Sequence, residues 1–282
     1  MKKYFMIAVA ASMIFCLAGC GASKNQFKGV STPEDTKALL EKVVQANNYD
    51  EIFKEYGSVD CVETQIANNN TKVYTYRSKN VMFIHGDDMT EGFQYETLDR
   101  SVVLDLNNLK CPWHSCPLDE ATFAEAQKNY LACFADITFP RNYDEYEVSI
   151  VDDNTLVLEK DNDVYSYTCN PATLLVMNSS YRFADQEELY MTNEYTYNQV
   201  DNDKEHTSWV DGYVKAVSGG QTVHVKVNGV DGKVYESDFP KGFVARIYTP
   251  GADLYKHIDS DEYYNEYGEV LTEDVELDAV TE

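Results

Sequence analysis

The polar and apolar pattern of the chain begins with two predicted helices. Leucine and valine recur at helical spacing between Leu39 and Val44. The preceding Thr32-Pro33-Glu34-Asp35 offers an N-cap, a proline at the first helical position and acids in the first turn. A second, shorter helix is predicted over Tyr49 to Tyr56 and should stop at Gly57.

From Thr71 the pattern changes to runs rich in Val, Ile, Tyr and Thr, separated by Asn, Asp and Gly. Such runs are typical of antiparallel strands. Between two sets of strands, apolar residues at intervals of three and four from Phe123 to Ile137 predict an inserted helix. The predicted strands are 73–76, 81–85, 93–97 and 101–106, and after the helix 146–150, 156–159, 164–169, 174–183 and 189–197.

The C-terminal part predicts a small β unit over 201–268. The polar stretch 201–205 should separate it from the first sheet, and further strands are expected over 209–217, 222–227 and 233–239. Gly219-Gly220 and Asn228-Gly229 are the expected hairpin turns. This unit either extends the first sheet or forms a module of its own. Residues 269–282 should form a disordered acidic tail.

One hairpin carries a resemblance to a known family. The run Tyr167-Thr168-Cys169-Asn170-Pro171-Ala172-Thr173-Leu174-Leu175-Val176-Met177 resembles the strand, Asp-Pro-x-Thr turn and strand of the LolA-like envelope lipid carriers, with Asn170 in place of the usual Asp. The order of helix, meander, inserted helix and further meander over 31–200 is similar too. The alternative is an unrelated antiparallel sheet with helices on one face, in which Pro-Ala-Thr is only a turn.

The resemblance implies a mainly β (α+β) fold, in which an antiparallel meander curls into a half-barrel around a cavity for acyl chains. It also implies that catalytic residues are absent. The cavity candidates are apolar and lie on predicted strands of the similar region: Val148, Ile150, Leu156, Leu158 and Leu175.

The first residues resemble the leader of a bacterial lipoprotein. A positive start precedes the apolar run from Tyr4 to Phe15, which is shorter than the about 20 residues that a membrane-spanning helix needs. Leu17-Ala18-Gly19-Cys20 resembles the lipobox, which implies cleavage of residues 1–19 and a lipid on Cys20. An ordinary signal peptide is the alternative. We therefore expect a flexible linker over 20–30 and a location on the extracytoplasmic face of a cell membrane.

The charge of the chain argues against binding to nucleic acid. Its 23 Lys and Arg face 48 Asp and Glu, giving a formal charge of −25, so there is no basic field to hold a phosphate backbone. Because the predicted leader contains two lysines and no acid, its removal would make the charge −27.

The cysteines suggest little chemistry. Four residues separate Cys111 from Cys116, unlike a redox Cys-x-x-Cys pair, and a local disulfide suits an exported protein. With His114 they could supply only three ligands of a zinc site, so neither a metal nor a cofactor is expected. If Cys20 is lipidated, five thiols remain in the mature chain and at least one stays unpaired or pairs between molecules.

Three classes of function follow. The first is a non-catalytic lipoprotein that binds a lipid or other hydrophobic ligand in the half-barrel. The second is a surface protein that holds an envelope protein or a glycan through a tyrosine-rich face. An envelope enzyme has the least support, because no nucleophile motif is present and His85, beside Asp87 and Asp88, is better explained as a strand-end residue. The tyrosines on predicted strands are Tyr74, Tyr76, Tyr165, Tyr167, Tyr190, Tyr195 and Tyr197.

Overall fold

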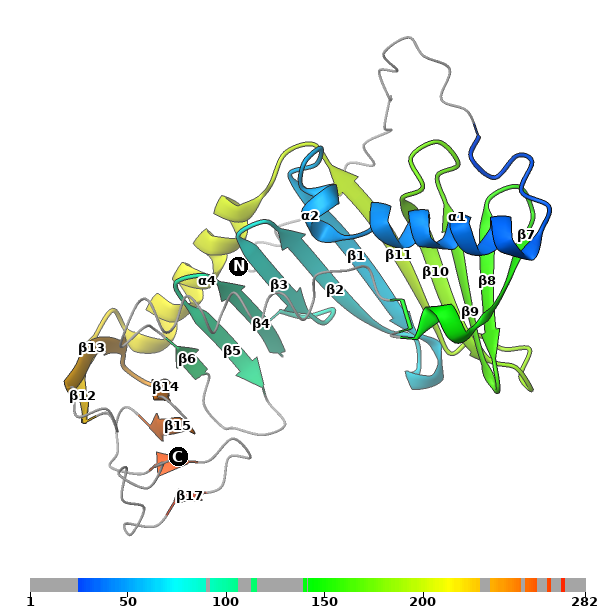
Figure 1. Ribbon diagram of the computed structural model, residues 1–282. Helices are drawn as coiled ribbons and strands as arrows, with labels where there is room; N and C mark the ends of the chain where they lie inside the picture. Colours follow the sequence, from blue (N-terminus) through cyan, green and yellow to red (C-terminus); the bar gives the residue numbers. More distant parts are fainter. Residues whose placement is uncertain are drawn as a thin grey trace, which may run out of the picture.

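The computed structural model describes residues 25–89, 92–105, 113–115, 139–140, 142–228, 234–249, 252–257, 263–264 and 270–271 (Figure 1). Within these ranges the fold is mainly β, with few helices. Several expected features lie outside the described residues. They are the leader, Cys20, Cys111, Cys116, the helix expected from Phe123 to Ile137, and the acidic tail apart from residues 270–271.

Ten strands form one continuous antiparallel, open sheet in the described chain. Their order is β5-β4-β3-β2-β1-β11-β10-β9-β8-β7. The bounds are β1 Ser58–Gln65, β2 Thr71–Ser78, β3 Val81–His85, β4 Gly92–Thr97, β5 Ser101–Asp105, β7 Glu147–Val151, β8 Thr155–Lys160, β9 Asp163–Cys169, β10 Val176–Phe183 and β11 Met191–Asn198. Most of these were predicted, whereas β1 was not.

The C-terminal part extends the same sheet. Strand β6 (Trp113–Ser115) pairs antiparallel with β5, and β14 (Val244–Thr249) pairs parallel with β6. Beyond β14 lie β15 (Ala252–His257), β16 (Tyr263–Tyr264) and β17 (Val270–Leu271). The predicted hairpin is present as β12 (Thr222–Asn228) and β13 (Val234–Pro240), which form a separate two-stranded sheet.

The strand predicted over 209–217 is wrong. These residues belong to helix α4 (Asp203–Ser218), and most of the expected polar break forms its first turn. Val210 is buried and Val214 partly buried, a spacing of four that puts them on one helix face, although the Val and Tyr content favours a strand. Gly219 and Gly220 have φ values of +61° and +75°, so they end this helix instead of forming a hairpin turn.

The N-terminal helices begin where the sequence predicts them, but the second ends at Ile52, four residues before the predicted end at Tyr56. Helix α1 spans Pro33–Ala46, and the Thr32 side chain accepts a hydrogen bond from the Asp35 backbone N–H at 3.1 Å. The short helix α2 spans Tyr49–Ile52. Two 3-10 turns, η1 (Ile66–Asn68) and η2 (Tyr143–Glu145), lie at strand ends.

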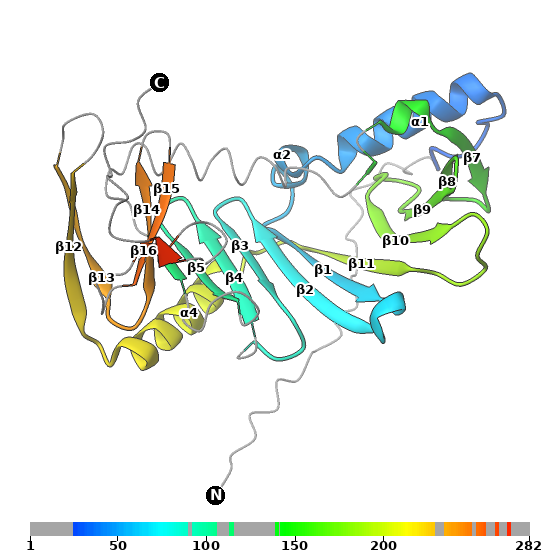
Figure 2. The same cartoon turned by 90° about the horizontal axis from the view of Figure 1, so that it is seen from below.

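Helices α1 and α4 cover opposite faces of the sheet (Figure 2). On β2, Tyr76 pairs with Asp60 and Phe83 and shares their face, which α4 covers. Val59 is next to Asp60 along β1, so its side chain points to the other face, where it joins the core under α1. Helices therefore cover both faces of the sheet, one on each.

Each helix packs on its own hydrophobic core. Under α1, the buried Leu40 and Val43 share a cluster with residues of the strands β8 to β10. Under α4, Val210 shares a second cluster with residues of β2 to β5 and with Phe243. The strand residues of the second cluster are Tyr76, Phe83, Phe93, Tyr95, Val102 and Leu104, with Val81 at the start of β3.

The folded part begins earlier than expected. Residues 25–30 were assigned to a flexible linker, but Phe27 is buried in the α1 core. The Gln26 backbone N–H donates to the Pro171 carbonyl at 2.9 Å, and the Gln26 side chain donates to the Ala172 carbonyl at 2.9 Å. The linker prediction is therefore wrong for residues 25–30. Burial of one phenylalanine and two hydrogen bonds offset the entropy lost when this short segment is ordered.

No helix in the described ranges combines the length and apolar character needed to cross a membrane.

Candidate functional site

The five candidate cavity residues all belong to the α1 side of the sheet. Leu156, Leu158 and Leu175 are buried in the α1 core, and Val148 and Ile150 on the edge strand β7 are partly buried against it. The structure therefore brings these five residues together. Helix α1 contributes Leu39, Leu40 and Val43 to the same core, so apolar side chains from the helix and the sheet meet there.

The same sheet face carries a row of five aromatic side chains that begins within this core, and we call it the aromatic row. Neighbouring ring centroids are 4.9 to 5.9 Å apart, within the range of favourable aromatic pairs. Tyr146 is buried at one end, the middle rings are half-buried, and Tyr190 is 44% exposed at the other end. The row consists of Tyr146, Tyr165, Tyr181, Phe183 and Tyr190.

Strand register creates this row. Tyr165 on β9 pairs with Tyr181 on β10, so their rings stand side by side, 4.9 Å apart. Phe183 lies two residues further along β10 and therefore shares the face of Tyr181. Tyr190 precedes β11, and its backbone N–H donates to the Tyr181 carbonyl at 2.8 Å, which brings its ring to 5.8 Å from the Tyr181 ring.

Carboxylates lie beside the aromatic row. The Tyr181 hydroxyl donates to Asp163 Oδ1 at 2.7 Å. Partial burial, followed by this hydrogen bond and the Asp163 charge, raises the pKa of Tyr181. At the buried end, the pKa of Tyr146 is raised by desolvation and then by Asp163, while Lys160 opposes the shift. Asp163 therefore places a negative charge beside the Tyr181 ring.

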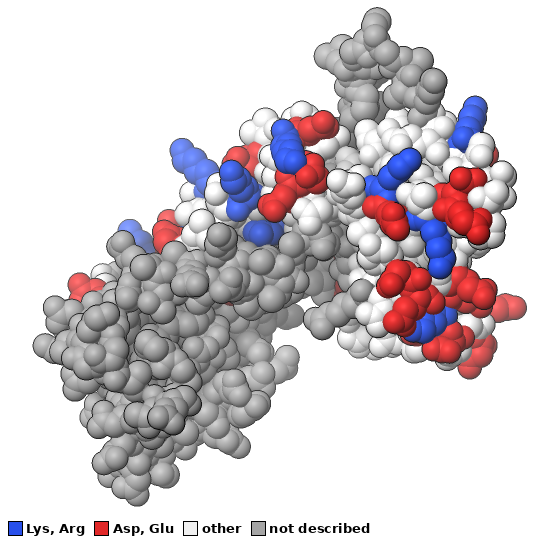
Figure 3. Space-filling model, viewed as in Figure 1, with Lys and Arg blue, Asp and Glu red and all other residues white. Residues whose placement is uncertain are grey.

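The lower end of the strands β7 to β11 is visibly acidic in Figure 3. The β8–β9 turn contributes Asp161, and the loop between β10 and β11 contributes Asp185, Glu187 and Glu188, all exposed. Two cations accompany them. Lys160 forms a salt bridge with Glu145, and Arg182 Nη1 donates to the carbonyls of its own loop.

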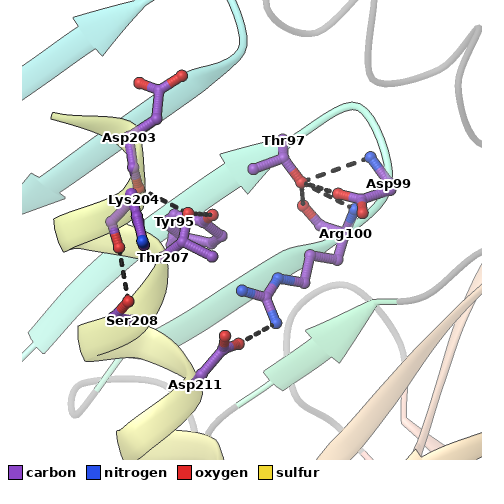
Figure 4. A network of polar contacts seen from close by, with 9 residues as sticks. All are labelled: Tyr95, Thr97, Asp99, Arg100, Asp203, Lys204, Thr207, Ser208 and Asp211. Carbon is purple, nitrogen blue, oxygen red and sulfur yellow. Dashed lines mark hydrogen bonds and ion pairs between the residues drawn. The ribbon is translucent and has the colours of Figure 1, made fainter. Parts of the chain in front are cut away.

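A second polar cluster fixes α4 to the sheet (Figure 4). Arg100 Nη1 lies 2.6 Å from Asp211 Oδ1, and the Tyr95 hydroxyl lies 2.8 Å from Thr207 Oγ1. The Arg100 guanidinium also lies 5.2 Å from the Tyr95 ring centroid. These groups are occupied with one another, so the cluster positions the helix.

His206 lies at the start of α4, between the helix and the sheet. Its ring is centred 4.1 Å from the ring of Tyr76 and 5.2 Å from the ring of Phe83. Burial lowers the pKa of His206 despite the opposing charge of Asp60, and burial raises the pKa of Asp60 itself. The Tyr76 hydroxyl donates to Asp203 at 2.7 Å and accepts from the Asn202 backbone N–H at 2.7 Å. A neutral imidazole in this setting packs as an aromatic ring.

The remaining chemical candidates have structural surroundings. His85 Nδ1 lies 2.6 Å from the Gly86 carbonyl, and its ring stacks on Tyr74 at 5.1 Å. Cys61 and Cys169 are free thiols, and burial raises the pKa of each to about 12, which makes them poor nucleophiles. Among the described residues, no group of three His, Cys, Asp or Glu is arranged to hold a metal ion.

The seven tyrosines singled out from the sequence have four different surroundings. Tyr167, Tyr195 and Tyr197 are buried under α1, and Tyr76 is buried under α4. Tyr74 stacks on His85, on the α4 face of the sheet. Only Tyr165 and Tyr190 belong to the aromatic row. Sequence reasoning missed the other three members, although the alternation of Tyr181 and Phe183 was a usable signal.

Comparisons with known proteins name no relative. No protein-family model matches this sequence, and no curated protein matches it either.

Proposed function

We propose that this chain is a membrane-anchored extracytoplasmic lipoprotein that binds an envelope partner, a protein or a glycan, through the aromatic row, without catalysis. The observation that carries the proposal is a continuous row of five rings that ends in the 44% exposed Tyr190. Aromatic side chains with one apolar face and a hydroxyl are typical of binding surfaces, since they give contact area at little entropic cost. Nucleic acid remains an unfavourable partner for a chain with a charge of −25.

The position of the predicted lipid on Cys20 supports an orientation in which the aromatic row points away from the membrane. Gln26 is bonded to Pro171 and Ala172, in the turn between β9 and β10. The six residues from Cys20 to Gln26 span at most about 21 Å, so a lipid on Cys20 keeps this turn near the membrane. The aromatic row lies at the opposite end of β9, beside Asp163. A protein anchored in this way presents the row away from the lipid surface.

A second candidate is the lipid carrier with a LolA-like half-barrel. It is favoured by the five apolar residues gathered beneath α1. A ligand there would require α1 to move away from the sheet, because Leu156 and Leu158 are fully buried against the α1 core. The half-barrel and its cavity belong to this second proposal.

Native mass spectrometry separates the two candidates. The soluble mature chain, residues 20–282 with Cys20→Ser, would be exported, purified and measured before and after denaturation. We expect the mass of the protein alone in both states. A copurified mass of lipid size that disappears on denaturation would contradict our first proposal and support the carrier.

A further inference from the structure

The surroundings of the aromatic row indicate the class of ligand that it accepts. We propose, building on the function proposed above, that the aromatic row binds a basic polypeptide segment, with lysine or arginine side chains lying over the tyrosine rings. Three features of the described residues carry this inference: a cation already seated at one end of the row, carboxylates beside the rings, and unpaired acids in the loop at the exposed end.

The first feature is an internal example of the contact. Lys160 Nζ lies 5.8 Å from the centroid of the Tyr146 ring while its charge is paired with Glu145. An ammonium within about 6 Å of an aromatic face is attracted by the ring quadrupole. The buried end of the row thus combines an aromatic face, a lysine and a carboxylate, and an incoming basic chain could repeat this arrangement along the other rings.

The second feature is the carboxylate in the middle of the row. Asp163 accepts the Tyr181 hydroxyl proton in a 2.7 Å hydrogen bond, so its charge polarises the phenol toward greater electron density. The exposed Asp161 lies in the adjacent turn, beside Lys160. A cation over Tyr165 or Tyr181 would gain from both the ring and these charges, whereas an anionic glycan or peptide would be repelled.

The third feature is the loop at the exposed end. Within the part of the chain that the structure describes, Asp185, Glu187 and Glu188 form no ion pair, and all three are exposed. The nearby Arg182 donates three hydrogen bonds to carbonyls of Phe183, Ala184 and Gln186. The row therefore ends in an acidic loop whose charges face solvent, which complements an extended basic segment.

The test uses a fluorescein-labelled lysine octapeptide and the soluble mature chain at about 0.15 M salt, where charges more than about 8 Å away are largely screened. The variant Tyr181→Leu/Tyr190→Leu removes two rings, and Tyr181→Phe/Tyr190→Phe retains them. The matched control is Tyr74→Leu. Tyr74 is also a strand tyrosine whose hydroxyl donates to an aspartate, at 3.1 Å from Asp87, but it stacks on His85 on the α4 face of the sheet.

We expect anisotropy titrations to show binding that falls about fivefold or more in the double leucine variant, since each exposed cation–π contact contributes a factor of about 2–5. The double phenylalanine variant keeps the rings and the Asp163 charge but loses the Tyr181–Asp163 hydrogen bond, so it should lose less binding than the double leucine variant. Tyr74→Leu should bind like the parent chain. Equal binding by all variants would mean attraction to the overall charge and would overturn the inference. Loss of peptide binding in Tyr74→Leu as well as in Tyr181→Leu/Tyr190→Leu would also overturn the inference.

The outcome also separates this inference from the function on which it rests. If the octapeptide does not bind while a partner is captured at the aromatic row in cells, the row is a binding surface but not one for cations. If neither occurs, both proposals fail. Circular dichroism of each variant confirms that the sheet is retained before binding is compared.

Discussion

Asn47 is the residue that joins the end of α1 to the β9–β10 hairpin. Its side chain is fully buried; the amide Nδ2 donates to the Val43 carbonyl at 2.7 Å and to the Leu174 carbonyl at 2.9 Å. Its Oδ1 accepts from the Val176 backbone N–H at 2.9 Å. One side chain thus satisfies backbone groups on both the helix and the strand. It also explains why the hairpin lies where it does beneath the helix.

Asn47→Ala should strongly destabilise the fold. The substitution leaves the Leu174 carbonyl and the Val176 N–H buried without these partners, and each orphaned group costs roughly 1–3 kcal/mol. Asn80→Ala, at an exposed turn residue, is the matched control and should change the free energy of unfolding by less than about 0.5 kcal/mol. Urea denaturation measures both, and equal stabilities would refute the bridging role of Asn47.

At the scale of elements, the sequence shows most of the fold and misses what depends on distant partners. Helix α1 was predictable because Thr32 and Pro33 begin it with local signals. The turn after β9 was predictable too, and Asn170 Oδ1 accepts from the Ala172 and Thr173 N–H groups, as the usual Asp would. Local signals did not predict helix α4. Its Val and Tyr residues favour a strand, and only its packing on the strands β2 to β5 shows which of them are buried.

The candidate site, too, was only partly predictable from the sequence. Alternation in the sequence pairs Val148 with Ile150 on β7 and Leu156 with Leu158 on β8. The β7–β8 register then shows that all four side chains share one face. The aromatic row joins residues from two strands, β9 and β10, and from two connecting segments, so it appears only once the register of Tyr165 with Tyr181 is known. Single-strand patterns contain no information about that register.

Two valines on α4 test the helix and its orientation. Val210 is 0% exposed in the α4 core, whereas Val217 is 38% exposed on the same helix. Val210→Ala should lower the free energy of unfolding by about 1–3 kcal/mol through lost burial and a residual cavity. Val217→Ala should be nearly neutral, because alanine is the better helix former. Thermal denaturation of the two variants decides the point, and the reverse ranking would contradict the packing of α4.

At the scale of the whole molecule, two helices on opposite faces divide one sheet into two packed halves. Helix α1 covers the strands β7 to β11 on one face, and α4 covers β2 to β5 on the other (Figures 1 and 2). The aromatic row lies on the α1 face, begins in the α1 core at Tyr146 and ends at the exposed Tyr190, at the end of the sheet away from the Gln26 contact. Under the proposed anchoring at Cys20, the row would face the space beyond the membrane.

The most direct test of that account is photo-crosslinking in cells that make the full-length protein. The photoreactive amino acid p-benzoylphenylalanine would replace Tyr190 in one strain and Tyr74, on the α4 face, in another. We predict a discrete crosslinked adduct of higher mass from position 190 and none from position 74. Equal labelling at both positions, or no adduct at position 190, would contradict the proposal that the aromatic row is the binding surface of this protein.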